Sequence, residues 1–333
     1  EYPVFGSNGI VGYHNDYLVK GPFIVVGRKG SAGSVHYSEK NGFPIDTTFF
    51  IKLENENEIL QKFLFLILNS LDLKNVNVQA GVPGLNRNDA YNLEIPVPPI
   101  EIQREIVEEI EGYQRIIDGA RMVVDNWKPN IELELEEARK AAGVDEWEMV
   151  KLGDVATLQY GFTASGKDEG EVRFIRITDI SDNGTLLENA LKFIDIDENS
   201  KKYLLNEDDL LVARTGATFG KTLLFSSKEK AIFASYLIRI KFIKNTILPR
   251  YYWYFSKSSN YWRQANNLVT GGGQPQFNGN AVTQLILSIP PVDIQKKIVE
   301  KFEFERDLIE INKKLINIYE EKIDRIVNSV WES

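Results

Sequence analysis

The most constraining feature of this sequence is an eleven-residue stretch that occurs twice. Residues 98–108 read Pro-Pro-Ile-Glu-Ile-Gln-Arg-Glu-Ile-Val-Glu, and residues 290–300 read Pro-Pro-Val-Asp-Ile-Gln-Lys-Lys-Ile-Val-Glu, an offset of 192 (290 minus 98). Two prolines followed by an acidic residue are typical of the first turn of a helix, because proline fixes φ and the helix dipole favours a negative charge there. The sequence therefore predicts two long helices with related starts.

Apolar residues follow each start at steps of three, four and seven, the spacing of a coiled-coil stripe. Such a stripe could belong to two separate amphipathic helices, each packed on its own domain. We favour packing of the two helices on each other, because a heptad pattern of this length needs a partner. The residues assigned to this packing are Ile102, Ile106, Ile110, Ile117, Ile294, Ile298, Phe302, Ile309, Ile316 and Ile323.

The repeat extends upstream of the helices. Arg28-Lys29-Gly30 resembles Arg214-Thr215-Gly216 at an offset of 186 (214 minus 28), and each half also carries an apolar helical segment, at 58–69 and 250–266. Runs rich in β-branched and aromatic residues predict strands at 23–26, 48–53, 174–177, 210–213 and 231–242. The expected order is a first domain at 1–98, a helix at 99–127, a linker at 128–146, a second domain at 147–289 and a helix at 290–333.

The two copies differ in length. Counting back from Arg28 and Arg214 places Glu1 opposite Leu187, about forty residues into the second domain (187 minus 147). We therefore expect the first domain to lack its beginning here.

Composition excludes several classes of protein. The chain has a net charge of −9 and no cysteine, so it has neither disulfides nor thiolate metal sites. His14 and His36 are the two histidines and lack metal-site spacing, so no metal site is expected. The sequence contains no run of about 18 apolar residues, which a membrane-spanning helix would need. We expect a cytoplasmic protein without a membrane partner.

Two motifs imitate enzyme signatures. Residues 216–222 resemble a phosphate-binding loop, but three residues separate the glycines where four are needed. We interpret this stretch as a tight turn between strands. The Pro-Pro pairs lack the flanking polar and aromatic residues of amino-methyltransferases, and no carboxylate pair suggests acid–base work. No catalytic residue is expected.

Taken together, the repeated Pro-Pro-x-x-x-Gln-x-x-Ile-Val helix start, the Trp147 to Val155 domain opening (Trp-x-x-Val-Lys-Leu-Gly-Asp-Val) and the Gly6 to Ile10 stretch with Arg28-Lys29-Gly30 resemble specificity subunits of type I restriction-modification systems. The resemblance covers nearly the whole chain. It implies an α+β fold with two similar target-recognition domains separated by two long antiparallel helices, in a pseudo-two-fold arrangement.

The resemblance also implies a function. Each recognition domain would read one half of a bipartite asymmetric site on double-stranded DNA, and the helices would set the spacing. Partners would be two methyltransferase subunits, which carry S-adenosylmethionine, and restriction subunits that translocate and cut DNA. This chain would bind no cofactor and would not be an enzyme. A recognition module fused to or paired with another type of restriction enzyme, and a protein scaffold that binds no DNA, are the alternatives.

Polar residues in the matched loops are the candidates for DNA contact. Arginine and glutamine side chains suit guanine and adenine edges, respectively, whereas backbone near a Gly turn can approach phosphate. Repetition of Arg28 as Arg214 favours a phosphate or structural role, and Asn86 and Asn278 could equally cap turns. The candidates are Arg28, Lys29, Ser31, Asn86, Arg87, Tyr160, Thr163, Lys167, Arg214, Thr215, Thr218, Lys221, Gln274, Gln276 and Asn278.

Overall fold

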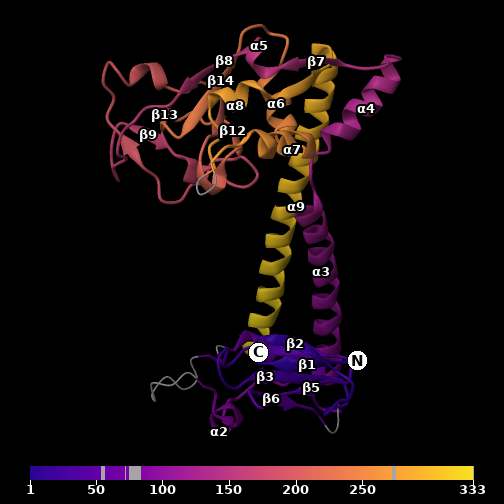
Figure 1. Cartoon of the computed structure of the whole chain (residues 1–333). Helices are drawn as coiled ribbons and strands as arrows, with labels where there is room; N and C mark the ends of the chain where they lie inside the picture. Colours follow the sequence, from indigo (N-terminus) through magenta and orange to yellow (C-terminus); the bar gives the residue numbers. More distant parts are fainter. Residues whose placement is uncertain (54–56, 72, 75–83, 272–274, 333) are drawn as a thin grey trace. The chain divides into compact units, whose positions relative to one another are not determined.

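The computed structural model describes residues 1–53, 57–71, 73–74, 84–271 and 275–332. It divides into two compact units, a first unit of Glu1–Asn126 with Ile309–Ser333 and a second unit of Trp127–Leu308. Figure 1 shows the course of the chain and labels its main elements. Each unit combines small sheets with helices, which confirms the predicted α+β class.

Two three-stranded sheets, in the orders β2-β1-β5 and β4-β3-β6, form the globular part of the first unit. The central strand β3 reads Phe-Ile-Val-Val-Gly and is buried along its whole length, as aliphatic strands in a core are. The elements of the first unit are β1 (Tyr2–Gly6), β2 (Gly9–His14), β3 (Phe23–Gly27), β4 (Val35–Ser38), β5 (Phe43–Pro44), β6 (Thr48–Ile51), α1 (Gln61–Ser70), α2 (Arg87–Tyr91) and α3 (Ile100–Asn126).

The second unit contains sheets in the orders β12-β11-β14-β8, β10-β9-β13 and β15-β7. Its core includes five consecutive aromatic residues of α6, all buried. Its elements are α4 (Ile131–Ala142), β7 (Glu148–Lys151), α5 (Leu152–Val155), β8 (Ala156–Tyr160), β9 (Val172–Ile175), β10 (Phe193–Ile194), β11 (Leu210–Ala213), β12 (Thr222–Leu224), β13 (Ala231–Phe233), β14 (Leu237–Phe242), α6 (Pro249–Phe255), α7 (Ser259–Leu268), α8 (Gly279–Thr283), β15 (Ile286–Ile289) and α9 (Val292–Glu332, whose last part belongs to the first unit).

The structure refines several predicted boundaries. The run at 231–242 is two strands in different sheets, and the helical segment at 250–266 is split into α6 and α7. The segment predicted as a linker contains α4, which Asn130 caps by accepting a hydrogen bond from Leu133 N and which ends at Gly143 with φ 67°. These are local signals for a helix start and stop.

The alignment of the two copies is corrected by their sheets. Phe5 O accepts a hydrogen bond from Ile45 N, and Ile175 O accepts one from Ala234 N, so β1 corresponds to β9. The offset there is 170 (175 minus 5), which places Glu1 opposite Glu171 rather than Leu187. The count from the sequence was wrong because the connection between β9 and β11 is longer than the one between β1 and β3.

A buried glutamine holds the start of each long helix. Gln103 Oε1 accepts from Leu60 N at 2.9 Å, while its Nε2 donates to Glu58 O at 2.7 Å and Pro98 O at 2.8 Å. Gln103 is 0% exposed. Leu60 is the N-cap residue of α1, so this side chain satisfies a backbone donor that the start of α1 leaves unpaired.

Gln295 makes the same contacts in the second unit. Its Oε1 accepts from Leu248 N at 2.9 Å, and its Nε2 donates to Thr246 O at 2.7 Å and Pro290 O at 2.8 Å. Leu248 is the N-cap residue of α6. We call each glutamine with its three backbone partners a glutamine latch.

Within the first unit, α3 packs antiparallel against the last part of α9 (Figure 1). Val107 shares a buried cluster with Val330, and the rings of Tyr113 and Tyr319 lie 5.0 Å apart. Arg121 pairs with Glu320 at 2.5 Å. Of the assigned packing residues in this unit, Ile110, Ile117 and Ile309 are buried and Ile106, Ile316 and Ile323 are partly buried.

Four packing assignments are corrected. Ile102 is 43% exposed, because Gln103 takes the buried position of that turn. Ile298 and Phe302 are buried in the core of the second unit, and Ile294 is partly buried against that core. The first turns of α9 therefore cover the domain that precedes them. The apolar stripe of α9 packs on a domain core near the start of the helix and on α3 in its later part.

Candidate nucleic-acid interface

In the first unit, the turn after β3 is joined to the loop before α2. Arg28 O accepts a hydrogen bond from Leu85 N at 3.0 Å, and Lys29 forms a β-bridge with Gly84. This pairing fixes the backbone of two loops that lie far apart in the sequence. It brings the candidate residues Arg28 and Lys29 next to Asn86 and Arg87.

The joined loops line an open groove of about 760 Å³. Its lining includes the cations Arg28, Lys29 and Arg87, all exposed, and no carboxylate among the residues that the structure describes. The guanidinium of Arg28 lies over the Phe49 ring at 5.6 Å, which restrains its position. An exposed cationic groove of this kind suits a phosphate backbone.

The second unit repeats the same joint. Arg214 O accepts from Phe277 N at 2.7 Å, and Thr215 forms a β-bridge with Gln276. Gln276 also exchanges two backbone hydrogen bonds with Thr270, at 2.7 and 3.1 Å. Its backbone is therefore fixed from both sides, and its partly buried side chain starts from a rigid position.

Arg214 lies between two tyrosine rings. Its guanidinium is 5.2 Å from the centre of the Tyr160 ring and 5.5 Å from that of Tyr236, and its Nε donates to Ser235 O at 2.9 Å. The Tyr160 hydroxyl accepts from Gly279 N at 2.8 Å. We call Tyr160, Arg214 and Tyr236 the aromatic cradle. Tyr160, which the sequence placed among the loop candidates, is the last residue of β8.

Tyr236 is the residue that the sequence interpretation missed. It is 52% exposed in the turn between β13 and β14, and Tyr160 is 44% exposed. The signal was an aromatic residue inside a strand run that had been read as continuous. Exposed aromatic rings around an arginine can stack on bases or sugars.

Asn86 and Asn278 have structural roles. Asn86 Oδ1 accepts from Asn88 N at 2.9 Å at the start of α2, and Asn278 Oδ1 accepts from Ala281 N at 3.1 Å at the start of α8. Both are N-caps, the turn role that the sequence left open beside DNA contact. They hold the loops that present Arg87 and Gln276.

The remaining candidates lie in varied surroundings. Thr215 is 3% exposed, and the Thr218 hydroxyl donates to Thr215 O at 3.4 Å, so these two threonines brace the turn. Lys221 pairs with Asp182 at 2.5 Å, and Lys167 pairs with Asp195 at 2.8 Å. These ion pairs lower the pKa of both aspartates and raise that of Lys167. The ion pairs compete with phosphate for both lysines.

Three other candidates complete the set. Ser31 O accepts from the Ser34 hydroxyl at 2.8 Å, which closes the turn after β3. Thr163 is exposed after β8. Gln274 lies outside the described residues.

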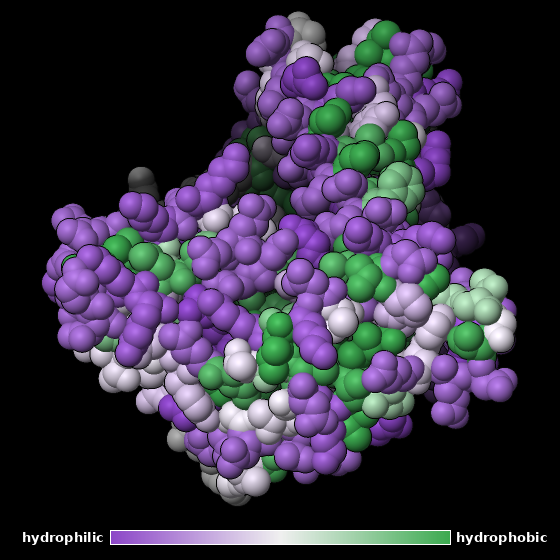
Figure 2. Space-filling view, turned by 90° about the horizontal axis from the view of Figure 1, so that it is seen from above, coloured by the Kyte–Doolittle hydropathy of each residue, from purple (hydrophilic) through white to green (hydrophobic). Residues whose placement is uncertain are grey.

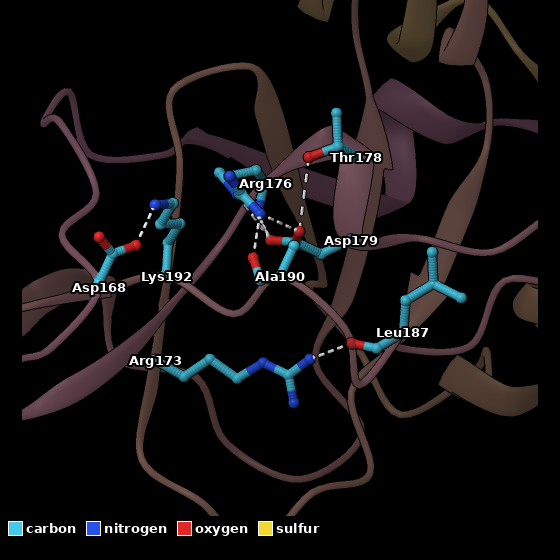
Figure 3. A network of polar contacts seen from close by, with 8 residues as sticks. All are labelled: Asp168, Arg173, Arg176, Thr178, Asp179, Leu187, Ala190 and Lys192. Carbon is cyan, nitrogen blue, oxygen red and sulfur yellow. Dashed lines mark hydrogen bonds and ion pairs between the residues drawn. The ribbon is translucent and has the colours of Figure 1, made fainter. Parts of the chain in front are cut away.

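Two further arginines of the second unit are held by internal partners (Figure 3). Arg176 pairs with Asp179 at 2.6 Å and donates to Ala190 O at 2.9 Å. Arg173 is 3% exposed and donates to Leu187 O at 2.5 Å. These guanidiniums hold the segment after β9 in place.

The face in Figure 2 shows hydrophobic residues in small groups among hydrophilic ones. Among the described residues, no helix is long and apolar enough to cross a membrane. The same residues contain no group of three or more His, Cys, Asp or Glu side chains arranged to hold a metal ion.

Comparisons with known proteins identify the family. Residues 1–120 and 144–320 match the family described as "Type I restriction modification DNA specificity domain". The chain belongs to this family, whose role is recognition of DNA sequence.

Individual relatives agree with this assignment. The MjaVIII type I restriction enzyme specificity subunit of Methanocaldococcus jannaschii is 24% identical over 323 residues, covering 90% of this chain and 75% of the relative. A type I specificity subunit of Haemophilus influenzae is 22% identical, covering 90% and 80%. The crystal structure of the type I S subunit from M. genitalium shares the fold, with a TM-score of 0.57 and 15% identity over 99% of this chain and 88% of that one.

Proposed function

We propose that this chain is the non-catalytic specificity subunit of a type I restriction-modification complex, and that each of its domains reads one half of a bipartite asymmetric DNA site. The observation that carries the proposal is the loop joint present in both units. In each unit, a strand-turn arginine is bonded through its backbone to a loop that holds a different polar side chain, Arg87 or Gln276. A shared scaffold with diverged reading residues suits two related domains that recognise unlike half-sites.

Methyltransferase subunits that carry S-adenosylmethionine would bind along the helices, and restriction subunits would join them. In the first unit, Ile311 and Ile318 of α9 are 57% and 49% exposed and lie seven residues apart. On α3, Ile116 and Val123 repeat this spacing at 38% and 47% exposed. Exposed apolar positions at heptad spacing support further helices as partners. Such a complex would act on DNA in the cytoplasm.

A methylome and a binding assay test the proposal together. In cells that carry this chain with its methyltransferase partners, modified adenines should report a split asymmetric motif. Domain swaps should change one half of that motif at a time. In vitro, duplex binding should be specific, salt-dependent and tighter with the partners present. An unchanged methylome, together with no salt-dependent affinity in the assembled complex, would leave the protein-scaffold alternative.

A further inference from the structure

The second unit contains a small, partly open cavity that neither the loop joint nor the aromatic cradle lines. Its volume is about 260 Å³, and Gly184, Thr185, Ser226, Arg250, Trp253 and Arg306 are among the residues lining it. Drug-sized ligands need about 300–1,000 Å³, whereas one water takes about 30 Å³. The space therefore suits a small ion with a few waters.

The indole of Trp253 supplies an unused donor. Trp253 is 5% exposed, and its Nε1 is buried without a hydrogen-bond partner among the described residues. Gly184 has φ +73°, and a Cβ at that position would lie 3.0 Å from Nε1 and 2.1 Å from Lys257 Nζ. Gly184 lines the cavity, so a neutral N–H and an ammonium both lie beside one of its lining residues. A buried donor of this kind is costly unless something accepts its hydrogen bond.

Positive charge surrounds the same indole. Lys257 Nζ lies 4.7 Å from the centre of a Trp253 ring, and the Arg306 guanidinium lies 5.2 Å from it. Lys257 donates to Thr222 O and Oγ1 at 3.3 Å, both neutral acceptors. Burial, with Arg306 and Lys221 nearby, lowers the pKa of Lys257 to about 7. The two cations beside the indole favour an anion over another cation at this site.

Carboxylates in the area are already engaged by arginines. Glu303 holds Arg306 at 3.2 Å and Arg250 at 3.5 Å, which positions both guanidiniums. Glu188 also lines the cavity, and it pairs with Arg173 at 3.0 Å.

The first unit lacks these groups at the equivalent positions. The glutamine latches align Trp253 with Phe65 (offset 188, 248 minus 60) and Arg306 with Gln114 (offset 192, 295 minus 103). By contrast, the ion pair Lys62–Glu111 is kept as Arg250–Glu303. That ion pair is common to both units, whereas the indole N–H and the extra guanidinium occupy these positions in the second unit.

We propose that this cavity of the second domain is a phosphate-binding site, with Trp253 Nε1 and Arg306 as its donors and the ammonium of Lys257 beside the indole. Phosphate and its esters present several acceptor oxygens and negative charge in a volume that fits the cavity. The source is either free inorganic phosphate or a phosphate of the DNA backbone.

Calorimetric titration of the full chain with inorganic phosphate tests the site, with chloride at equal ionic strength as the reference. Saturable binding is expected, and Trp253→Phe and Arg306→Gln should each weaken it at least tenfold. Trp253→Phe keeps the ring and removes the donor, while Gln is the residue of the first repeat. Arg325→Gln, an exposed position on α9, is the control and should bind phosphate like the unmodified chain.

A DNA arm distinguishes the two sources. If the ligand is a DNA phosphate, Arg306→Gln lowers duplex affinity in the complex with methyltransferase partners, and inorganic phosphate competes with DNA more strongly than chloride does. If it is free phosphate, the variant loses phosphate binding and keeps its DNA affinity. Binding no stronger than that of chloride, or equal phosphate affinity in folded Trp253→Phe and Arg306→Gln proteins, would overturn the proposal. Neither result would affect the DNA-reading role.

Discussion

Gln103 and Gln295 each donate two hydrogen bonds to backbone carbonyls and accept one from the N-cap amide of a helix, with matching distances in two different domains. Both side chains are 0% exposed. A buried polar group with all its partners fixes one arrangement of the chain, because every alternative leaves a group unpaired.

Replacing either latch glutamine by leucine should destabilise the domain that contains it. Each unpaired buried group costs about 1–3 kcal/mol, so Gln103→Leu or Gln295→Leu should lower the free energy of unfolding by about 3 kcal/mol or more. Hydrogen exchange resolved by peptide would show faster exchange in the first domain for Gln103→Leu and in the second for Gln295→Leu. Gln114→Leu, at an exposed position of α3, should change little. Equal stability of all three variants would contradict the role of the latches.

Base reading should depend on the two polar side chains that differ between the joined loops. Arg87→Ala and Gln276→Ala should each weaken specific binding by about 1–3 kcal/mol and relax preference at one position of one half-site. Lys29→Ala should instead weaken binding to all sequences alike and reduce the salt dependence. Competition binding with single-base variants of the site would separate these patterns, and a uniform loss for Arg87→Ala would reassign it to phosphate.

The aromatic cradle should require the guanidinium plane of Arg214. A lysine keeps the charge but cannot stack between Tyr160 and Tyr236 in the same way. Arg214→Lys should therefore lower DNA affinity in the assembled complex several-fold, while thermal melting stays close to that of the unmodified chain. Tyr236→Ala should act in the same direction. Full DNA affinity in both variants would limit the cradle to a structural role.

Among the apolar positions of α3, only the buried ones should contribute to helix pairing. Ile117 is 1% exposed, whereas Ile102 is 43% exposed. Ile117→Ala should lower the free energy of unfolding by about 2–5 kcal/mol, the usual range for such a truncation in a core. Ile102→Ala is the matched control and should stay within about 0.5 kcal/mol. Urea denaturation of the two variants measures the difference.

Lys257 should make stability depend on pH. Its pKa is about 7 in the folded chain, below its usual value, so the unfolded chain binds more protons between that pH and the ordinary lysine range. Lys257 therefore destabilises the folded chain fully below pH 7, and this destabilisation decreases as pH rises toward the ordinary lysine pKa. Lys257→Met should raise the melting temperature at pH 7, with a gain that shrinks by pH 10. A gain independent of pH would point to packing alone.

Local patterns predicted much of the fold, and particular residues show why. The Pro-Pro start and the heptad spacing located both long helices, and the aliphatic run of β11 gave that strand its observed bounds. Ile298 and Phe302 were misassigned because heptad spacing does not identify the apolar surface against which the stripe packs. Their aromatic neighbours on α6 come from a distant part of the sequence.

The candidate site was predicted in part. Matching the repeats located Arg28, Arg214 and the loops bonded to them, because the correspondence between the two halves is visible in the sequence itself. Tyr236 was missed because it lies in a turn inside a run that looked like one strand. It reaches Arg214 through the pairing of β14 with β11, which the sequence does not show. Ion pairing of Lys167 with Asp195 likewise depends on contacts that spacing does not encode.

All the partners of the glutamine latches are main-chain atoms. The latches themselves therefore do not depend on which other side chains the domain carries, provided that its backbone follows the same path. Two domains built on such latches can carry different DNA-reading side chains on one common backbone framework.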